Sequence, residues 1–407
     1  MTLSRRALIG SAAALPVLGG RSARAQAAST LKVGVLTDLS GAYRDLGGPV
    51  SVAAAQQAIE EFASKGFKVE VVQADHQNKT DVGAGIARQW YDRDGVDLIV
   101  DVPNSGVGLA IAGVAKDKNK AYMNSGSATS DLTGSQCNAN TIHWTYDTYE
   151  LAKSTGSAAV KAGGDTWFFI TADYAFGTAL QRDTTEFVTQ AGGKVVGSVR
   201  YPFPGTTDFS SLLLQAQSSG AKILGIANAG TDTVNTIKQS QEFGVTPGMK
   251  LAGLLVFISD IHAIGLEVAQ GLLLTNSFYW DANDRTRKFA ERFKPKAPAV
   301  RPTMVQAGVY ASVLHYLKTT ADKGVPFMKA DGAAAVSAMK ALPTDDDCFG
   351  QGSIRADGRK LSPSYLWEVK KPGESKAPWD YYKLVATTPA DQAFRPLDKG
   401  GCSLVHA

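Results

Sequence analysis

Apolar and polar residues alternate along this chain in blocks that predict strands and helices in turn. Compact apolar runs stand at LKVGVL (31–36), KVEVVQ (68–73) and DLIVDV (97–102). Between the first two runs, apolar residues recur at spacings of three and four, the stripe of an amphipathic helix, at Val52, Ala55, Ile59 and Phe62. A helix-like stretch also separates the second run from the third. Strands separated by helices predict a parallel sheet with helices on both faces.

The same order of elements begins again after residue 148. TWFFI (166–170), KVVGSV (194–199) and KILGIA (222–227) predict three further strands, although no residue-level repeat links the two units. The last third of the chain is mixed, with a helix predicted over 307–324 and a hairpin over 355–371. About 380 residues follow the N-terminal segment, more than one hydrophobic core usually serves, so we expect two domains.

The N-terminal segment predicts export. It has a short basic start, the apolar run LIGSAAALPVLGG and then ARA at 23–25, which a signal peptidase accepts, so we expect an export signal over 1–27 and cleavage near Ala25. The paired arginines of SRRALIG resemble a twin-arginine signal, which carries folded proteins, and an ordinary secretory signal is the alternative. Both place the protein outside the cytoplasm. The run is too short to span a bilayer stably.

Charge and cysteine usage narrow the classes of function. Of the 42 basic residues, four lie in the export segment, Arg5, Arg6, Arg21 and Arg24, which leaves 38 basic and 38 acidic residues. With no basic tract, we expect no nucleic-acid partner. Three cysteines, Cys137, Cys348 and Cys402, allow one disulfide and one spare thiol. Neither they nor the five scattered histidines match a metal-site pattern, so we expect no metal.

Polar loops follow the predicted strands, where a parallel sheet binds its ligands. In the first unit these loops offer Tyr43, Arg44, Asn104, Ser105, Ser125, Gly126 and Ser127, and in the second Tyr174, Asn228, Asp232 and the stretch 254–260. Each loop has a structural alternative, because serine and asparagine often cap helices and a loop tyrosine often packs. Six such loops at equivalent strand ends favour a ligand site between the two units.

These residues carry a resemblance to a known family. LKVGVLTDLSGAYRDLG, PNSGVGLAIAGVA, NSGSATSDLTG, ITADYAFGTAL and PFPGTTDFSSLL are similar to the branched-chain amino acid receptors among the periplasmic solute-binding proteins of ABC transporters. The similarity covers nearly all of the chain from about residue 30. It implies the type I periplasmic binding fold, with two doubly wound α/β lobes of three layers joined by three crossovers. The implied lobes are 28–148 plus 277–345 and 149–276 plus 346–407.

The resemblance also implies roles for residues. Serine hydroxyls and backbone amides of the N-terminal lobe would hold a ligand carboxylate, at Asn104, Ser105, Gly126 and Ser127 with Ser125 adjacent, and Tyr174 would come from the second lobe. Amino-acid members bind the ligand ammonium with an acid in the stretch that here reads GLLVFISD, whose centre is apolar at Leu255, Val256 and Phe257. A cation there would be desolvated without a partner. Asp232 could substitute for that acid or cap a helix.

The apolar residues in place of this acid favour an aromatic or aliphatic carboxylate that lacks an α-ammonium group as the ligand. A branched-chain amino acid-like compound is the alternative. Phe257 and Tyr174 could enclose a ring, and Arg44 could pair with a carboxylate. We expect a monomeric binding protein in the periplasm that needs no cofactor, performs no catalysis and delivers its ligand to an ABC permease. A soluble ligand-sensing receptor is the alternative, and a hydrolase is a weaker one, since no G-x-S-x-G elbow occurs. The resemblance further implies a disulfide between Cys137 and Cys402.

Overall fold

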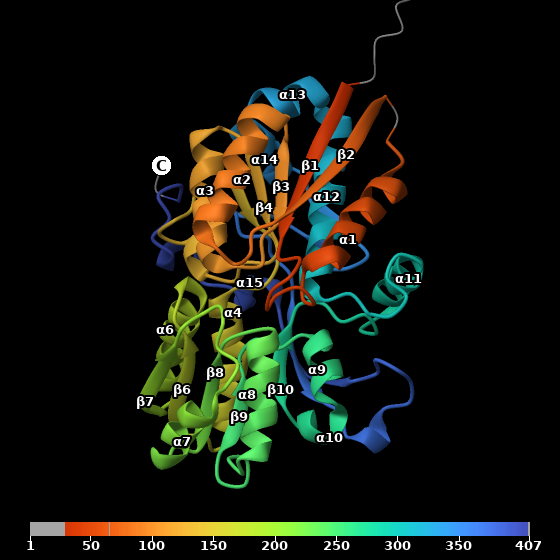
Figure 1. The fold of residues 1–407 in the computed structure, drawn as a ribbon. Helices are drawn as coiled ribbons and strands as arrows, with labels where there is room; N and C mark the ends of the chain where they lie inside the picture. The colour runs from red at the N-terminus through yellow and green to blue at the C-terminus, as the bar shows by residue number, and fades with distance from the viewer. Residues whose placement is uncertain (1–28, 65, 406–407) are drawn as a thin grey trace, which may run out of the picture.

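Two parallel sheets form the centres of two stacked lobes in the computed structural model, which describes residues 29–64 and 66–405 (Figure 1). The predicted export signal over 1–27 and its cleavage near Ala25 lie outside the described residues. The predicted fold class of two doubly wound α/β lobes is confirmed.

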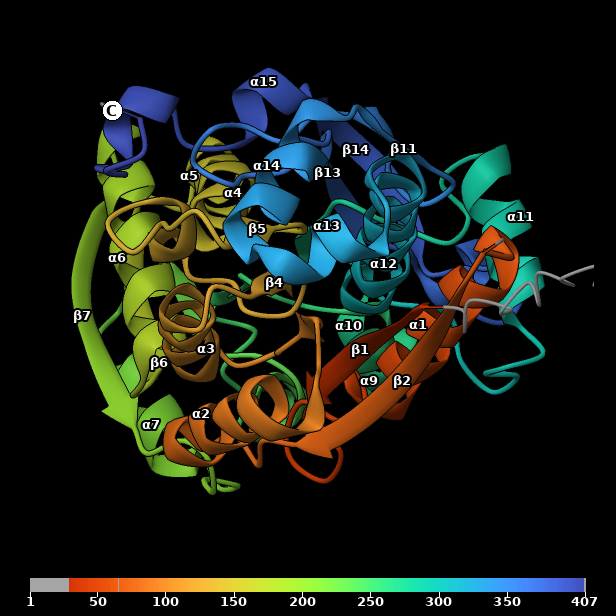
Figure 2. The same ribbon diagram turned by 90° about the horizontal axis from the view of Figure 1, so that it is seen from above.

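The N-terminal lobe is built on five parallel strands in the order β2-β1-β3-β4-β5. The strands are β1 (Ser29–Thr37), β2 (Phe67–Asp75), β3 (Leu98–Asp101), β4 (Ala121–Asn124) and β5 (Thr141–His143). Helices α1 (Gly48–Phe62) and α12 (Met304–Lys323) pack together on one face, and α2 (Thr80–Gln89) and α3 (Ser105–Asp117) pack together on the other (Figure 2). Every residue of β3 and β4 is buried, as expected for strands covered on both faces. Helices α13 (Val325–Ala330) and α14 (Gly332–Ala341) complete this lobe.

The C-terminal lobe is built on four parallel strands in the order β7-β6-β8-β9. The strands are β6 (Thr166–Ala172), β7 (Lys194–Tyr201), β8 (Ile223–Ala227) and β9 (Lys250–Gly253). The helices of this lobe are α6 (Ala175–Gln190), α7 (Ser210–Ser218), α8 (Thr231–Glu242), α9 (Ile258–Ile264) and α10 (Leu266–Ala269). The three strands predicted here from apolar runs are therefore present, in a shared sheet.

The hairpin predicted over 355–371 is wrong in its pairing. Its turn does form, since the Gly358 N–H donates to the Arg355 carbonyl at 3.0 Å and Ile354 bridges Lys360. Beyond Pro363, which cannot donate a ladder hydrogen bond, β13 (Ser364–Val369) instead pairs with β10 (Leu273–Asn276) and β14 (Tyr382–Thr388) in a separate antiparallel sheet. Sequence alternation reveals a strand but not its partner.

Three passages between the lobes follow β5, follow β10 and precede β13, and after β14 the tail returns to the N-terminal lobe (Figure 1). Shorter elements lie along these passages and the tail: α4 (Thr148–Leu151), α5 (Ser157–Lys161), α11 (Asp284–Phe293), β11 (Thr344–Asp346), β12 (Gly350–Gly352) and α15 (Ala390–Ala393). The segment 346–405 touches both lobes, because β13 pairs with β10 whereas Arg359 bridges His143 of β5. The lobe boundaries given above therefore stay a prediction.

A disulfide joins Cys137 to Cys402, with their Cα atoms 5.5 Å apart, which is the pairing that the resemblance implies. Cys348 is a buried free thiol. Across residues 29–64 and 66–405, no helix is both long enough and apolar enough to cross a membrane. The same residues contain no group of three or more His, Cys, Asp or Glu side chains that could hold a metal ion.

Candidate ligand-binding site

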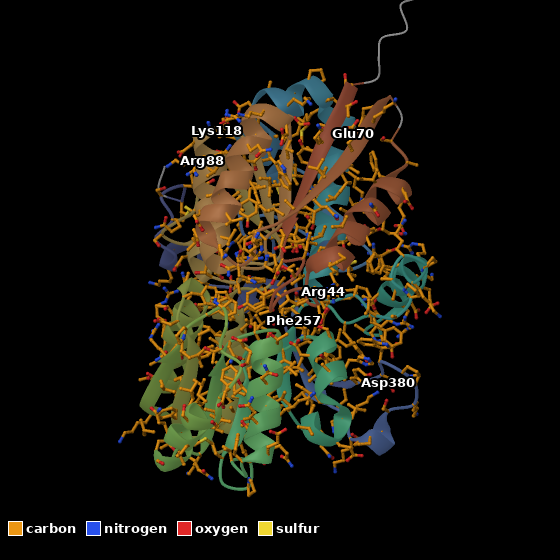
Figure 3. All side chains as sticks on the ribbon, in the orientation of Figure 1. Arg44, Glu70, Arg88, Lys118, Phe257 and Asp380 are labelled. Carbon is orange, nitrogen blue, oxygen red and sulfur yellow. A yellow bond between two sulfur atoms is a disulfide. The ribbon has the colours of Figure 1, made fainter. Side chains whose placement is uncertain are left out.

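A cavity of about 210 Å³ lies where the carboxyl ends of the two sheets meet. Its lining comes from loops that follow strands in both lobes, the place where open parallel sheets bind ligands. The residues that line it are Tyr43, Leu46, Pro103, Ser105, Gly126, Ala128 and Tyr146 from the N-terminal side and Tyr174, Phe176, Ala229 and Leu255 from the C-terminal side. Arg44 and Phe257 mark this level of the molecule in Figure 3.

Two larger cavities lie elsewhere, and their positions make them weaker candidates for a ligand-binding site. One, of about 500 Å³, lies beside α11, and its charged residues Arg285 and Asp347 pair with each other at 2.9 Å. The other, of about 1230 Å³, is a mostly apolar groove beside α10 that includes Ile223 and Lys250, the first residues of β8 and β9. Neither lies at the carboxyl ends of the two parallel sheets, so the cavity between the lobes is the candidate site.

The Ser105 hydroxyl is placed to donate a hydrogen bond into the cavity. Its oxygen accepts from the backbone N–H groups of Ala128 and Thr129, each at 3.2 Å. A hydroxyl has two acceptor positions and one donor, so this arrangement leaves the O–H as its free group. Ser105 is also the first residue of α3, a helix of 13 residues whose N-terminus carries partial positive charge. Donor and helix end together favour an anionic ligand group.

Gly126 brings backbone to the cavity wall. A Cβ atom here would lie 2.6 Å from the Pro103 Cα, so only glycine fits between the two loops. The Gly126 carbonyl accepts a hydrogen bond from the Tyr146 hydroxyl at 2.9 Å. Tyr146 therefore presents its ring to the cavity while its polar atom is satisfied.

The wall of the cavity holds no charged side chain among the described residues. Leu255 lines it, and the fully buried Phe257 packs behind, with its ring 5.8 Å from that of Tyr146 in an edge-on contact. The predicted apolar stretch therefore lies at the cavity, although Leu255, and not Phe257, forms the surface. An ammonium group buried against this wall would lose its hydration without gaining a charged partner.

Tyr174 meets Tyr43 across the gap between the lobes. Their hydroxyl groups are in hydrogen-bond contact, and burial raises the pKa of both phenols, so both stay protonated at neutral pH. One hydroxyl donates to the other, and the accepting hydroxyl keeps its own proton as a donor. The polar groups that face the cavity are thus mainly donors.

Four predicted residues lie near the site without lining the cavity, and the side chains of three of them bond to other partners, whereas the buried Ser125 hydroxyl has no hydrogen-bond partner among the described residues. Asn104 caps α3 by accepting from the Val107 N–H at 3.1 Å, and the Ser127 hydroxyl lies 2.6 Å from the Val102 carbonyl. Ser125 lies against Gly308 of α12, and Asn228 bonds to Thr233 and Thr236 of α8. These contacts hold the loops in shape without lining the cavity.

The two charged candidates also lie off the cavity wall. Arg44 is exposed and pairs with the neighbouring Asp45 at 2.8 Å. Asp232 accepts a hydrogen bond from the Tyr201 hydroxyl at 2.8 Å, and burial raises the pKa of its carboxyl group to about 6. Of the ten predicted ligand-binding residues, the structure brings Ser105, Gly126 and Tyr174 to the cavity.

Sequence reasoning missed several lining residues, and Tyr146 is the one with a signal that could have found it. Tyr146 follows β5 at the same strand end as the other loops, so the strand-end rule would have included it had TIH (141–143) been predicted as a strand. Leu46, Pro103, Ala128, Phe176 and Ala229 carry no polar group, and nothing in the sequence separates such residues from core packing.

The loop that carries Pro103 and Ser105 leaves β3 through a strained backbone. Asp101 and the β-branched Val102 adopt φ values of +81° and +63°, which non-glycine residues rarely adopt. Asp101 is fully buried, and this burial raises the pKa of its carboxyl group to about 7. Such strain is characteristic of functional loops, because the surrounding structure must impose it.

Comparison with known proteins places these features in a family. The model of a family described as periplasmic binding protein matches residues 30–375. A periplasmic binding protein of Burkholderia mallei is 49% identical with a TM-score of 0.89 and covers 93% of this chain and 99% of its own. A branched chain amino acid ABC transporter periplasmic ligand-binding protein of Burkholderia xenovorans is 41% identical with a TM-score of 0.80, covering 92% and 100%. The Leu/Ile/Val-binding protein homolog 6 of Brucella melitensis is 26% identical over 86% of this chain and 90% of its own.

Proposed function

Because this chain belongs to the periplasmic binding protein family, it is a periplasmic ligand-binding protein of an ABC transporter, and we propose that its ligand is a small carboxylate with an aromatic or aliphatic body and no ammonium group. Solved relatives are described as ligand-binding or substrate-binding proteins of ABC transporters. We propose that this chain likewise performs no chemistry, acts as a monomer after cleavage near Ala25, and passes its ligand to a permease.

One observation carries the choice of ligand: the cavity between the lobes offers hydrogen-bond donors and apolar surface but no carboxylate. The Ser105 hydroxyl and the N-terminus of α3 would hold the ligand carboxylate. Tyr146, Tyr174 and Leu255 would enclose its body. An α-amino acid would bring an ammonium group for which the lining supplies no partner, and the resulting loss of hydration costs several kcal/mol or about a thousandfold in affinity.

Calorimetric titration and thermal shift with benzoate, an aliphatic monocarboxylate such as 4-methylpentanoate, and leucine test the proposal. Aliphatic diacids and hydroxycinnamates extend the panel. A ligand that binds only the folded chain raises its melting temperature. We expect at least one monocarboxylate to give a larger shift than leucine. A larger shift in melting temperature with leucine than with every acid that lacks an ammonium group would contradict the proposal.

Two substitutions assign the contacts. Ser105→Ala should weaken the binding of the best acid about tenfold or more, because a hydrogen bond to a charged group is lost, whereas Ser218→Ala on an exposed face of α7 should leave it unchanged. Leu255→Asp should abolish acid binding and improve leucine binding, since it supplies the missing carboxylate. Ester or amide turnover that disappears with Ser105→Ala would contradict the absence of chemistry.

A further inference from the structure

Phe203, in the loop after β7, stacks on both tyrosines that meet across the lobes. Its ring centroid lies 5.1 Å from that of Tyr43 with the planes 23° apart, and 4.6 Å from that of Tyr174 with the planes 16° apart. Tyr43 belongs to the N-terminal lobe, whereas Tyr174 and Phe203 belong to the C-terminal lobe. Phe203 is half-buried and does not line the cavity. It therefore covers the contact between the lobes from outside the ligand site.

A backbone contact lies beside this aromatic group. The Thr231 N–H donates to the Ala42 carbonyl at 3.2 Å across the lobes. Gly230, with φ +61°, makes the approach possible, because a Cβ atom at this position would overlap the Ala42 carbonyl oxygen and lie 3.0 Å from the Tyr43 ring. We name the group formed by Tyr43, Tyr174, Phe203 and the Thr231–Ala42 hydrogen bond the interlobe latch.

Every contact of the interlobe latch joins protein to protein. Those that cross between the lobes, which are Phe203 with Tyr43, Tyr43 with Tyr174 and Thr231 with Ala42, favour the closed arrangement whether a ligand is bound or not. A ligand then adds its own differential affinity. Of the two stacks that Phe203 makes, only the one with Tyr43 crosses between the lobes, and one such aromatic pair shifts an equilibrium about twofold to tenfold. The stack with Tyr174 lies within the C-terminal lobe and holds Tyr174 in place against Tyr43.

We propose that Phe203 is a positioning residue that holds the lobes closed through Tyr43 and Tyr174, so that the ligand-free protein populates the closed form and Phe203 controls how fast the cavity opens. This goes beyond the proposed function, because the interlobe latch involves no ligand group and makes no use of the ligand's chemistry. Its consequence for transport is slow release of the ligand until a partner separates the lobes.

Small-angle X-ray scattering of the ligand-free full chain tests the proposal. The protein is unfolded, dialysed and refolded to remove any copurified ligand, and circular dichroism checks each variant for folding. Phe203→Ala should increase the radius of gyration because the open form gains population. Phe203→Tyr keeps the ring and should behave as the wild type. Phe243→Ala, at the end of α8 where the side chain is 54% exposed, is the matched control and should change nothing.

A second variant and a kinetic measurement keep the test decisive. Gly230→Ala should also open the lobes, although every aromatic residue keeps its identity in this variant. For an acid that binds, such as benzoate, Phe203→Ala should raise the dissociation rate constant about twofold to tenfold and leave the association rate constant nearly unchanged. A general loss of structure would instead lower the fraction of active protein. Identical radii of gyration for the wild type, Phe203→Ala and Gly230→Ala would overturn the proposal. The scattering result stands even if every acid fails to bind, so the two proposals fail separately.

Discussion

The Ser105 hydroxyl shows how one side chain can favour an anion without any positive charge. Two backbone N–H groups occupy its acceptor positions, so the hydrogen-bonding capacity left over is that of a donor. The same serine would also be compatible with a helix-capping role on sequence grounds. Its partners, and not its residue type, decide what it can offer a ligand.

At the same scale, Asp101 predicts a measurable pH dependence of stability. Burial raises the pKa of its carboxyl group to about 7, above the value of about 3.9 for an unfolded chain, so the native state holds an extra proton between these values. The stabilisation from this group is fully present below about pH 4 and is lost as the pH rises through about 7, at up to about 1.4 kcal/mol per pH unit. Asp101→Asn should remove the contribution of this group to the pH dependence of the free energy of unfolding.

Urea unfolding of both proteins at several pH values from 4 to 8 measures the two slopes. Other raised carboxyl groups, such as Asp260 with a pKa of about 8, contribute equally to both proteins and cancel in the comparison. Equal slopes for the wild type and Asp101→Asn would show that Asp101 titrates as an exposed carboxyl group does.

From residue identity, the loops around the candidate cavity could be predicted better than the individual residues that line it. Ser105 and Ser127 occupy similar loops, yet one faces the cavity and the other bonds to the Val102 carbonyl. Both are serines near strand ends, and only the path of the backbone separates them. Apolar lining residues such as Ala229 are harder still, because burial at a ligand site and burial in a core leave the same trace in a sequence.

At the scale of elements, the turn before β13 depends on Gly358. This residue adopts φ +85°, and a Cβ atom here would lie 2.5 Å from the Thr141 carbonyl oxygen of β5. Gly358→Ala should lower the free energy of unfolding by about 2 kcal/mol or more, through strain and displacement of the edge strand. Gly373→Ala has open space around its Cβ and should change it by less than about 0.5 kcal/mol.

Chemical denaturation of the wild type and both variants gives these differences. A Gly358→Ala protein as stable as Gly373→Ala would mean that this turn relaxes freely. The turn also explains why sequence reasoning found the reversal at 357–358 but not the pairing of β13: turn chemistry is local, whereas the partner β10 lies about 90 residues earlier. Strands and helices with local periodicity were predicted well for the same reason.

At the scale of the whole molecule, the disulfide fastens the tail to the N-terminal lobe. Cys137 and Cys402 are separated by 265 residues, and the chain between them builds all of the C-terminal lobe. Replacing both by serine should cost about 3 kcal/mol and lower the melting temperature by about 5 °C. Reducing agent should lower the melting temperature of the wild type to that of the double variant and leave the variant unchanged.

Scanning calorimetry with and without dithiothreitol measures both effects. No difference between the oxidised wild type and the double variant would show that the tail is held by its other contacts, such as the hydrogen bond from Arg395 to Ser130 at 2.7 Å. The two-lobe plan could be predicted from sequence because each lobe repeats a local order of elements. The division of 346–407 between the lobes could not, since it depends on contacts made after the chain returns.

Gly230 limits how closely the two lobes can approach each other. Because the smallest side chain would already act as a wedge against the Ala42 carbonyl, this position is a marker that can be read in any related sequence. Relatives with glycine here can bring their two halves as near as this chain does. A larger residue at this position would hold the two lobes farther apart when they close, and the cavity between them would then be wider.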